Sequence, residues 1–434
     1  QLSVCAMFRL SLLAAIAATT AEAFMVSPAL RAPNGRLATH SNRAVAPKMS
    51  LAAPPPKDMD LTDVLPDCPK TIWNTEGIDI AAAQAKYKAM DLPDSPLYIK
   101  ATPEDVAKGF DYFSENKEML MEKLRTHGAI LFQGFEVTKD PKGFRDAWTT
   151  LGLNPCLDPI HTSGLRSFLD QQNGVYEEVN KQSLAKHYIG LHNESTFKKT
   201  ATYGAFVCFN PATGGGGEFF IADGAKIFRD MRTDLLQKFY DEQVRISVSN
   251  LDLDFLGALG GLKEKSMDVV KGIVNTAVAP KFDMDLDMIY GADGNEMRLQ
   301  AVEHKQSPIN RHPDTGMPVW FCNIHNHARY LRDNRPCTVP EVGMTEVYYG
   351  DLSKISKEDL DHINEVSNKH IVDFRMEKGD VLLVDNYRVL HGRDIFEGDR
   401  LHAVTWFRKG DEDVDMVKPD NFLNSLINQA ISWK

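Results

Sequence analysis

Hydrophobic residues in this chain gather mostly in short runs, and in several runs they alternate with polar residues. Such runs, bounded by glycine, aspartate or charged residues, predict β-strands. We expect strands at 128–135, 203–209, 218–222, 243–248, 318–324, 371–376, 380–386 and 401–408. No β-α-β alternation and no repeat period is visible, which argues against a parallel sheet with crossover helices.

Apolar residues spaced three and four apart predict helices in other stretches. These are 115–126, 224–240, and 141–152, which starts with proline and ends with glycine. Strands nevertheless dominate. The pattern favours a mainly β fold with flanking helices, whose core is two packed sheets in a jelly roll, or double-stranded β-helix.

The stretch 250–300 interrupts the strands with a long apolar, glycine-bearing segment followed by an acidic one. An interruption of this length in a β-sandwich is typical of an inserted lid over a substrate. An outer helix pair packed on the core fits the pattern equally well. A segment that contacts a membrane surface is a third option.

The first 56 residues differ from the rest in composition. From Met7 to Ala23, a basic residue, an apolar stretch and a small-residue cleavage pattern are typical of a secretory signal peptide. Residues 24–56 contain no acid and are rich in alanine, serine, proline and arginine, as in an organelle transit peptide. The combination resembles the leaders of algal plastids enclosed by extra membranes. We therefore expect the plastid stroma, with a secreted protein as the alternative.

Charge narrows the classes of partner. The chain has 434 residues and a net charge of −11, and without the five basic residues and one acid of its leader it falls to about −15. A chain with so much negative charge lacks the excess of basic residues that is typical of a nucleic-acid-binding protein. No apolar run after the leader reaches the roughly 20 residues that span a bilayer. The five cysteines beyond Cys5 show no CxxC spacing, so neither a zinc ribbon nor a disulfide framework is expected.

Candidate chemistry begins at "GLHNEST", residues 190–196. His192 and Glu194 are two apart, so in a strand they share a face, although many such pairs occur by chance. His391 follows the apolar strand of "DVLLVDNYRVLHGRDIFEGDR" at 380–400. Two histidines and one carboxylate leave three positions free on an iron ion, which suits Fe(II) oxygenases. Arg400 follows nine residues later, and arginine holds a carboxylate through two parallel hydrogen bonds.

These motifs, with "LRTHGAILFQGF" and "GGGGEFFIADGAKIFRDM", resemble the taurine dioxygenase and γ-butyrobetaine hydroxylase superfamily over residues 115–410. The resemblance implies an enzyme that uses Fe(II), 2-oxoglutarate and O₂. It implies His192, Glu194 and His391 as iron ligands and Arg400 as the anchor of the distal 2-oxoglutarate carboxylate. Decarboxylation to succinate would then drive hydroxylation or desaturation of a substrate. Residues 1–56 would be leader and linker, 57–114 an amino-terminal extension and 411–434 a tail.

Two departures from the family pattern stand out. Phe219 occupies the position where relatives commonly have a threonine that touches 2-oxoglutarate, so we expect an altered co-substrate pocket. The loop from His391 to Arg400 is also shorter than in many relatives, which leaves Arg408 as a second candidate anchor. Glu194 itself argues against a halogenase, because chloride-transferring relatives lack this carboxylate.

The substrate pocket is predicted from "NIHNHARY", which supplies His325, His327, Arg329 and Tyr330. His325 and His327 would share a strand face and form a second, less favoured metal pair. His187 and His402 flank the ligand segments and, with Asn323, are predicted to support the ligands or pack in the core; Trp320, Phe321 and Trp406 are predicted core residues.

The leading functional hypothesis is a plastid dioxygenase acting on a small molecule, with an apolar substrate and peripheral membrane contact as options. The expected plastid location and the reaction class point most specifically to pigment metabolism. The enzyme would then resemble chlorophyll c synthase, which oxidises a propionate side chain to an acrylate. An amino acid or betaine substrate is the alternative. A catalytically degenerate metal-binding sandwich acting as a binding protein is the competing class, and a metal-dependent hydrolase is disfavoured because it would not need Arg400.

Overall fold

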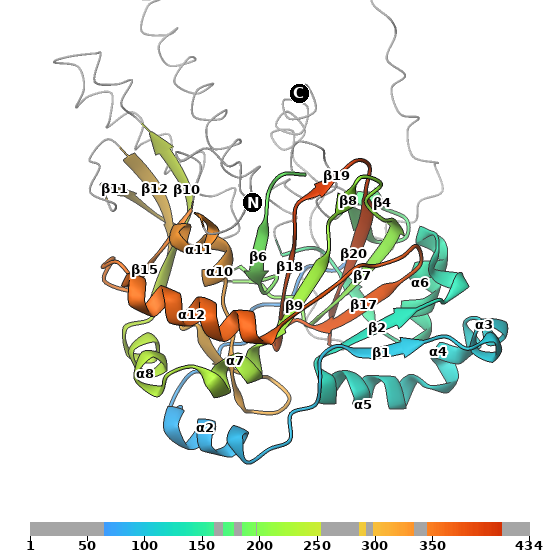
Figure 1. Cartoon of the computed structure of the whole chain (residues 1–434), viewed down its shortest axis with the longest axis horizontal. Helices are drawn as coiled ribbons and strands as arrows, with labels where there is room; N and C mark the ends of the chain where they lie inside the picture. Colours follow the sequence, from blue (N-terminus) through green and yellow to red (C-terminus); the bar gives the residue numbers. More distant parts are fainter. Residues whose placement is uncertain are drawn as a thin grey trace, which may run out of the picture.

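The computed structural model describes residues 65–159, 168–177, 185–196, 198–252, 286–291, 298–333 and 345–409. Two sheets at the centre lie across from each other (Figure 1). The larger, eight-stranded sheet has the order β1 (Leu97–Lys100), β2 (Ala129–Gln133), β17 (Val381–Asp385), β7 (Tyr203–Asn210), β20 (Leu401–Arg408), β5 (Val175–Glu177) and β4 (Phe168–Asp170), with β3 (Asn154–Cys156) also paired to β20. The smaller sheet has the order β16 (Ile371–Phe374), β9 (Phe219–Asp223), β18 (Val389–Arg393) and β6 (Ile189–His192). This arrangement confirms the predicted mainly β fold.

The central strands of the larger sheet (β2, β17, β7 and β20) are buried on both faces, which explains why they read as nearly continuous apolar runs. In β7, Phe206 and Cys208 point inward and pack with Phe219 of the smaller sheet. Ala205 and Val207 alternate with them and pack outward against helices. The inner layer of this core is the wall against which the candidate site is built.

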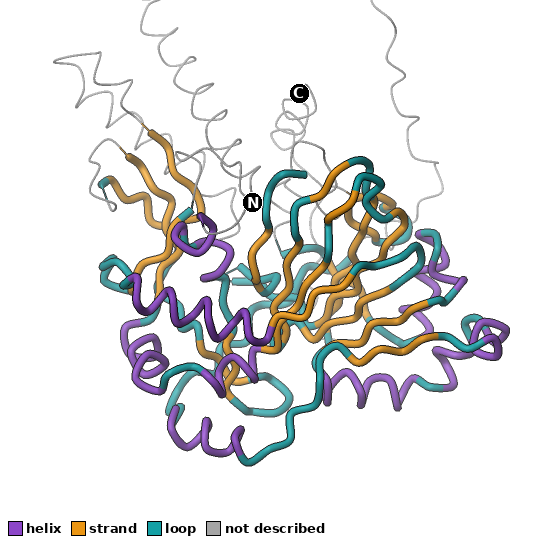
Figure 2. The backbone as a smooth tube through the Cα atoms, viewed as in Figure 1, coloured by secondary structure: helices purple, strands orange, loops and turns teal. Residues whose placement is uncertain are grey.

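Helices cover the outside of the two sheets (Figure 2). Beside the larger sheet lie α3 (Pro103–Lys108), α4 (Asp111–Glu115), α5 (Lys117–His127) and α6 (Pro141–Thr150). On the other side lie α2 (Ile80–Lys88), α7 (Gly224–Asp230), α8 (Thr233–Glu242), α10 (Ile324–His327), α11 (Arg329–Asp333) and α12 (Lys357–His370). None of the helices in the described ranges has the length and hydropathy needed to cross a bilayer.

A third sheet projects from the helical side of the molecule (Figure 1). Its order is β11 (Leu286–Tyr290), β12 (Arg298–Glu303), β10 (Val244–Asp252) and β15 (Glu346–Tyr349), all antiparallel. Two short pairs complete the strands, namely β13 (Ile309–Arg311) with β14 (Pro318–Trp320) and β8 (Gly215–Gly216) with β19 (Phe396–Glu397). The predicted interruption at 250–300 therefore contains strands at both ends, and residues 253–285 lie outside the described residues, as do the leader and the tail after 409.

Three predictions of secondary structure were wrong. β1 and β2 are parallel neighbours joined through α3, α4 and α5, so one crossover of the β-α-β type exists at the sheet edge. The helix predicted at 224–240 is two helices, because Met231 is extended and the N–H of Arg232 donates to His362 instead of continuing the helix. The strand predicted at 318–324 ends at Trp320, and residues 324–327 are helical.

Candidate active site

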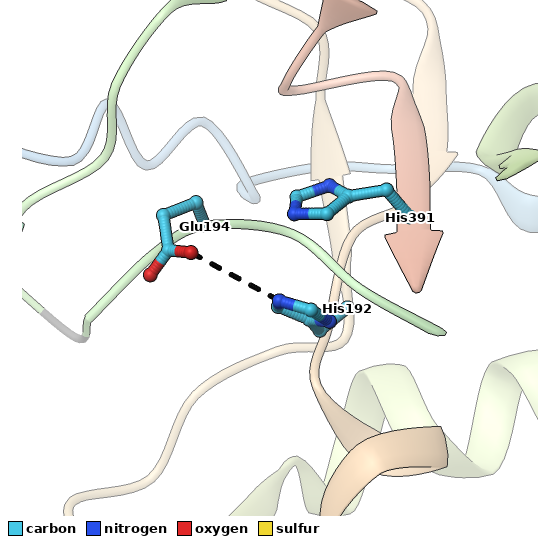
Figure 3. Close-up of side chains that lie close together, drawn as sticks. All are labelled: His192, Glu194 and His391. Atoms are coloured by element: carbon cyan, nitrogen blue, oxygen red, sulfur yellow. Dashed lines mark ion pairs between the residues drawn. The ribbon is translucent and has the colours of Figure 1, made fainter. Parts of the chain in front are cut away.

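Three side chains predicted from distant parts of the sequence come together at one end of the smaller sheet (Figure 3). His192 ends β6, Glu194 lies two residues beyond it, and His391 on β18 is the direct antiparallel partner of His192. One ligand atom from each residue lies within 4.8 Å of the others, and all three residues are buried. Within the described ranges, no other trio of histidine, cysteine or acidic side chains comes as close.

The ring of His192 is already oriented for a metal. Its Nδ1 lies 2.8 Å from the carbonyl oxygen of Gly190, and because a carbonyl only accepts, Nδ1 carries the proton. Nε2 therefore keeps its lone pair, and this atom lies 3.9 Å from Oε2 of Glu194. A histidine that binds a metal through one nitrogen and donates from the other is the usual arrangement in metal sites.

Asn386, which is completely buried, holds the backbone of Glu194 from both sides. Its Oδ1 accepts from the N–H of Glu194 at 2.9 Å, and its Nδ2 donates to the Glu194 carbonyl at 2.9 Å. The same Nδ2 donates to the carbonyl of Ala201 at 2.8 Å. One side chain thus fixes the residue that follows the end of β6, where strand pairing no longer does so.

Asn193, between the two candidate ligands, extends this network. Its Nδ2 donates to the carbonyl of Asn386 at 2.7 Å, and its Oδ1 accepts from the N–H of Cys322 at 3.0 Å. Its own N–H donates to Oδ1 of Asn323 at 3.1 Å. The predicted supporting role of Asn323 is consistent with this contact, whereas Asn193 and Asn386 were missed. Their adjacency to Glu194 and to the end of β17 was the available signal.

His391 is held differently, by aromatic rings from both sheets. The ring of Phe206 on β7 lies 4.9 Å from the His391 ring. Phe219 on β9 lies nearly parallel to it at 6.2 Å, and Trp406 on β20 lies at 6.0 Å. Phe219, the departure from the family pattern, therefore forms part of the apolar wall behind this histidine.

Arg400 is buried just before β20, against the glycine run. Its guanidinium lies 5.5 Å from the ring centre of Phe396 on β19. Gly217 adopts φ +74°, and a Cβ there would come within 3.3 Å of Arg400, so glycine leaves the room this side chain needs. The glycines therefore shape the surroundings of an arginine. Arg408, the second candidate anchor, is buried at the far end of β20.

Two buried arginines, Arg400 and Arg393, bring positive charge to this region. Burial lowers the pKa of His402 well below its usual value, and the charges of Arg400 and Arg393 lower it further. Burial raises the pKa of the Cys208 thiol to about 12, and Arg400 opposes that rise. Such a region favours an anion, as a carboxylate anchor requires.

The four residues predicted to line a substrate pocket do not share one environment. His325 accepts a hydrogen bond from Nε1 of Trp320 at 3.1 Å, and burial lowers its pKa to about 4. The hydroxyl of Tyr330 donates to Asp361 on α12 at 2.6 Å. Arg329 begins α11, and its N–H donates to Glu346. Because His325 and His327 lie on a helix, the predicted shared strand face was wrong.

A jelly roll that places two imidazoles and one carboxylate together defines the class of Fe(II)-dependent oxygenases, and the donor set fits that metal. Residues 94–406 match the model of the family described as "Taurine catabolism dioxygenase TauD, TfdA family", and the chain belongs to this family. It is therefore an Fe(II)- and 2-oxoglutarate-dependent dioxygenase, which uses O₂.

The individual proteins that this chain resembles share little sequence identity with it. The chain is 27% identical to "Dapdiamide synthesis protein DdaC" of Enterobacter agglomerans over 304 residues, which are 68% of this chain and 85% of that protein. Among solved structures, PvcB of Pseudomonas aeruginosa is 13% identical with a TM-score of 0.42, covering 72% of this chain and 85% of PvcB. An asparagine oxygenase in complex with Fe(II), hydroxyasparagine and succinate is 14% identical with a TM-score of 0.39, covering 76% and 89%.

Proposed function

We propose that His192, Glu194 and His391 hold the catalytic Fe(II), and that Arg400 holds the distal carboxylate of 2-oxoglutarate. The observation that carries this proposal is the buried cluster of three ligand atoms within 4.8 Å of one another. Bound there, Fe(II) supplies the redox chemistry that couples decarboxylation of 2-oxoglutarate to oxidation of the substrate. Asn193 and Asn386 orient the Glu194 segment. The rings of Phe206, Phe219 and Trp406 pack around His391 and keep water away from it.

The carboxylate of Glu194 favours oxidation by hydroxylation or desaturation over transfer of a halide. For the substrate, we propose an organic acid of plastid pigment metabolism, oxidised from propionate to acrylate as in a chlorophyll c synthase. Support for this finer step is the composition of residues 1–56 and the reaction class. An amino acid or betaine is the alternative substrate, and a leader fused to a fluorescent protein tests the proposed plastid location.

Anaerobic addition of Fe(II) and 2-oxoglutarate tests the assignment of the site. A visible charge-transfer band is expected for the wild-type protein, and admitting O₂ should then yield succinate. His391→Ala should abolish both signals, while Arg400→Leu should weaken 2-oxoglutarate binding and leave Fe(II) binding intact.

A protein that uses the same fold only for binding makes the opposite prediction. It would give neither the band nor succinate in the wild-type chain, and that result would overturn the proposed function. Incubation with a protochlorophyllide-type pigment, followed by mass spectrometry, decides the finer proposal. A product lighter by two hydrogens is expected, whereas products from amino acids or betaines alone would contradict the pigment assignment.

A further inference from the structure

Helix α10 lies directly on the strand that carries His192 (Figure 1). The N–H of Gly190 donates to Oδ1 of Asn326 at 3.0 Å, so the helix is bonded to β6 two residues before His192. A Cβ on Gly190 would lie 2.6 Å from the carbonyl oxygen of His325. Helix and strand are therefore in backbone contact, two residues before the candidate ligand His192.

Three of the four residues of α10 have a clear structural role. Ile324 packs in the core, His325 accepts from Trp320, and Asn326 accepts from Gly190. His327 has no such role. It is only 3% exposed, and its Nδ1 has no hydrogen-bond partner among the described residues. A buried polar atom without a partner is rare in native proteins and calls for an explanation such as a ligand.

The charges around His327 indicate what kind of ligand fits. Burial lowers the pKa of His327 well below its usual value and the charge of Arg332 lowers it further, so the ring is neutral and offers one N–H donor. Arg332 is buried on α11, where it donates to Oγ1 and to the carbonyl of Thr345, each at 2.7 Å. Arg332 is a neighbour of His327, because the Thr345 hydroxyl that accepts from Arg332 donates to the His327 carbonyl at 3.1 Å. A neutral N–H donor beside a guanidinium favours an anionic acceptor.

We propose that His327 binds a carboxylate of the substrate and so positions the substrate against the iron site. Of the four residues predicted to line the pocket, His327 is the one with a buried side-chain atom, Nδ1, that has no hydrogen-bond partner among the described residues. This inference rests on the proposed function for the iron site, and it narrows the substrate class to organic acids. The propionate proposed above belongs to that class.

A matched pair of substitutions on the same helix tests the proposal without a known substrate. His327→Phe removes a buried polar atom that has no partner, so the Tm of the protein should rise, by roughly 2 °C or more. His325→Phe removes the acceptor of the Trp320 N–H and should lower the Tm. His327→Leu serves as a second variant in case phenylalanine is too large. If both His327 variants lose stability as His325→Phe does, the histidine is structural and the proposal is wrong.

Ligand binding provides the second readout, with Mn(II) and 2-oxoglutarate bound so that Arg400 is occupied. Propionate should raise the Tm of the wild-type protein more than propionamide does, and His327→Phe should lose that difference. Equal effects of the two compounds on the wild type, or an unchanged difference in the variant, would overturn the proposal. A normal charge-transfer band in His327→Phe separates either outcome from a failure of the iron site itself.

Discussion

Two of the candidate iron ligands, His391 and Glu194, are held in different ways; they are called here the His391 arm and the Glu194 arm of the site. His391 lies within β18, paired to β9 and β6, and aromatic rings pack around it. Glu194 lies beyond the end of β6, and its backbone is fixed on both sides by the amide of Asn386. Strand pairing and packing suffice for the first arm, whereas the second depends on individual hydrogen bonds.

This difference has a consequence for substitutions. Many backbone hydrogen bonds of the β-ladder together fix the position of His391, so no single side chain determines it. The segment 193–195 has only an isolated bridge from Ser195 to Thr200, and three asparagines hold Asn193 and Glu194. Buried amides that satisfy every donor and acceptor rigidify a site, and losing one leaves several groups unpaired. Fe(II) affinity should therefore respond more to substitutions of the residues that support Glu194 than to substitutions of the residues that support His391.

Asn386→Ala should have the largest effect. It leaves the N–H and carbonyl of Glu194 and the carbonyl of Ala201 without this partner, which lowers stability by about 2 kcal/mol or more. Support of this kind around metal ligands is worth about 10- to 100-fold in affinity, so Fe(II) binding should weaken by that factor. Competition against a chromophoric chelator under anaerobic conditions measures it.

Asn310 provides the matched control. It is also completely buried, and it accepts from the N–H of Asn74 and donates to the carbonyl of Ile72, both at 2.8 Å. Asn310→Ala therefore breaks a similar amide clamp on a segment that carries no candidate ligand. It should lower stability but keep the wild-type Fe(II) affinity. Equal losses of affinity in the two variants would show that general destabilisation, and not the position of Glu194, is responsible.

Gly190→Ala should have an intermediate effect. The new Cβ would lie 2.6 Å from the carbonyl of His325 and 2.9 Å from Cα of Asn326, so α10 must shift away from β6. Overpacking of this kind costs about 1–3 kcal/mol. Because the Glu194 clamp and the bond from His192 to the residue-190 carbonyl remain, Fe(II) affinity should fall less than in Asn386→Ala. A loss as large as that of Asn386→Ala would mean that α10, and not Asn386, sets the ligand geometry.

Sequence predicted more of the larger sheet than of either side of the candidate site, since His391 was expected to follow a strand and instead lies within β18, which was not predicted. The apolar runs at 203–209, 380–386 and 401–408 marked β7, β17 and β20, because strands buried on both faces leave an unmistakable pattern. The only signal for the asparagines that fix Glu194 was their place beside Glu194 and the end of β17, since a buried asparagine in the folded chain looks like a loop asparagine in the sequence. His325 and His327 were placed on a strand because a four-residue helix is too short to show its period.

Phe219→Thr should have the smallest effect on the metal. The substitution removes a ring that lies parallel to His391 at 6.2 Å and leaves a cavity, which lowers stability by about 3 kcal/mol. His391 nevertheless keeps its pairing with Ile221 and His192 and its contact with Phe206, so Fe(II) affinity should stay near the wild-type value. The chelator competition used for Asn386→Ala measures this directly. A loss of affinity as large as that of Asn386→Ala would mean that aromatic packing, and not the β-ladder, positions His391.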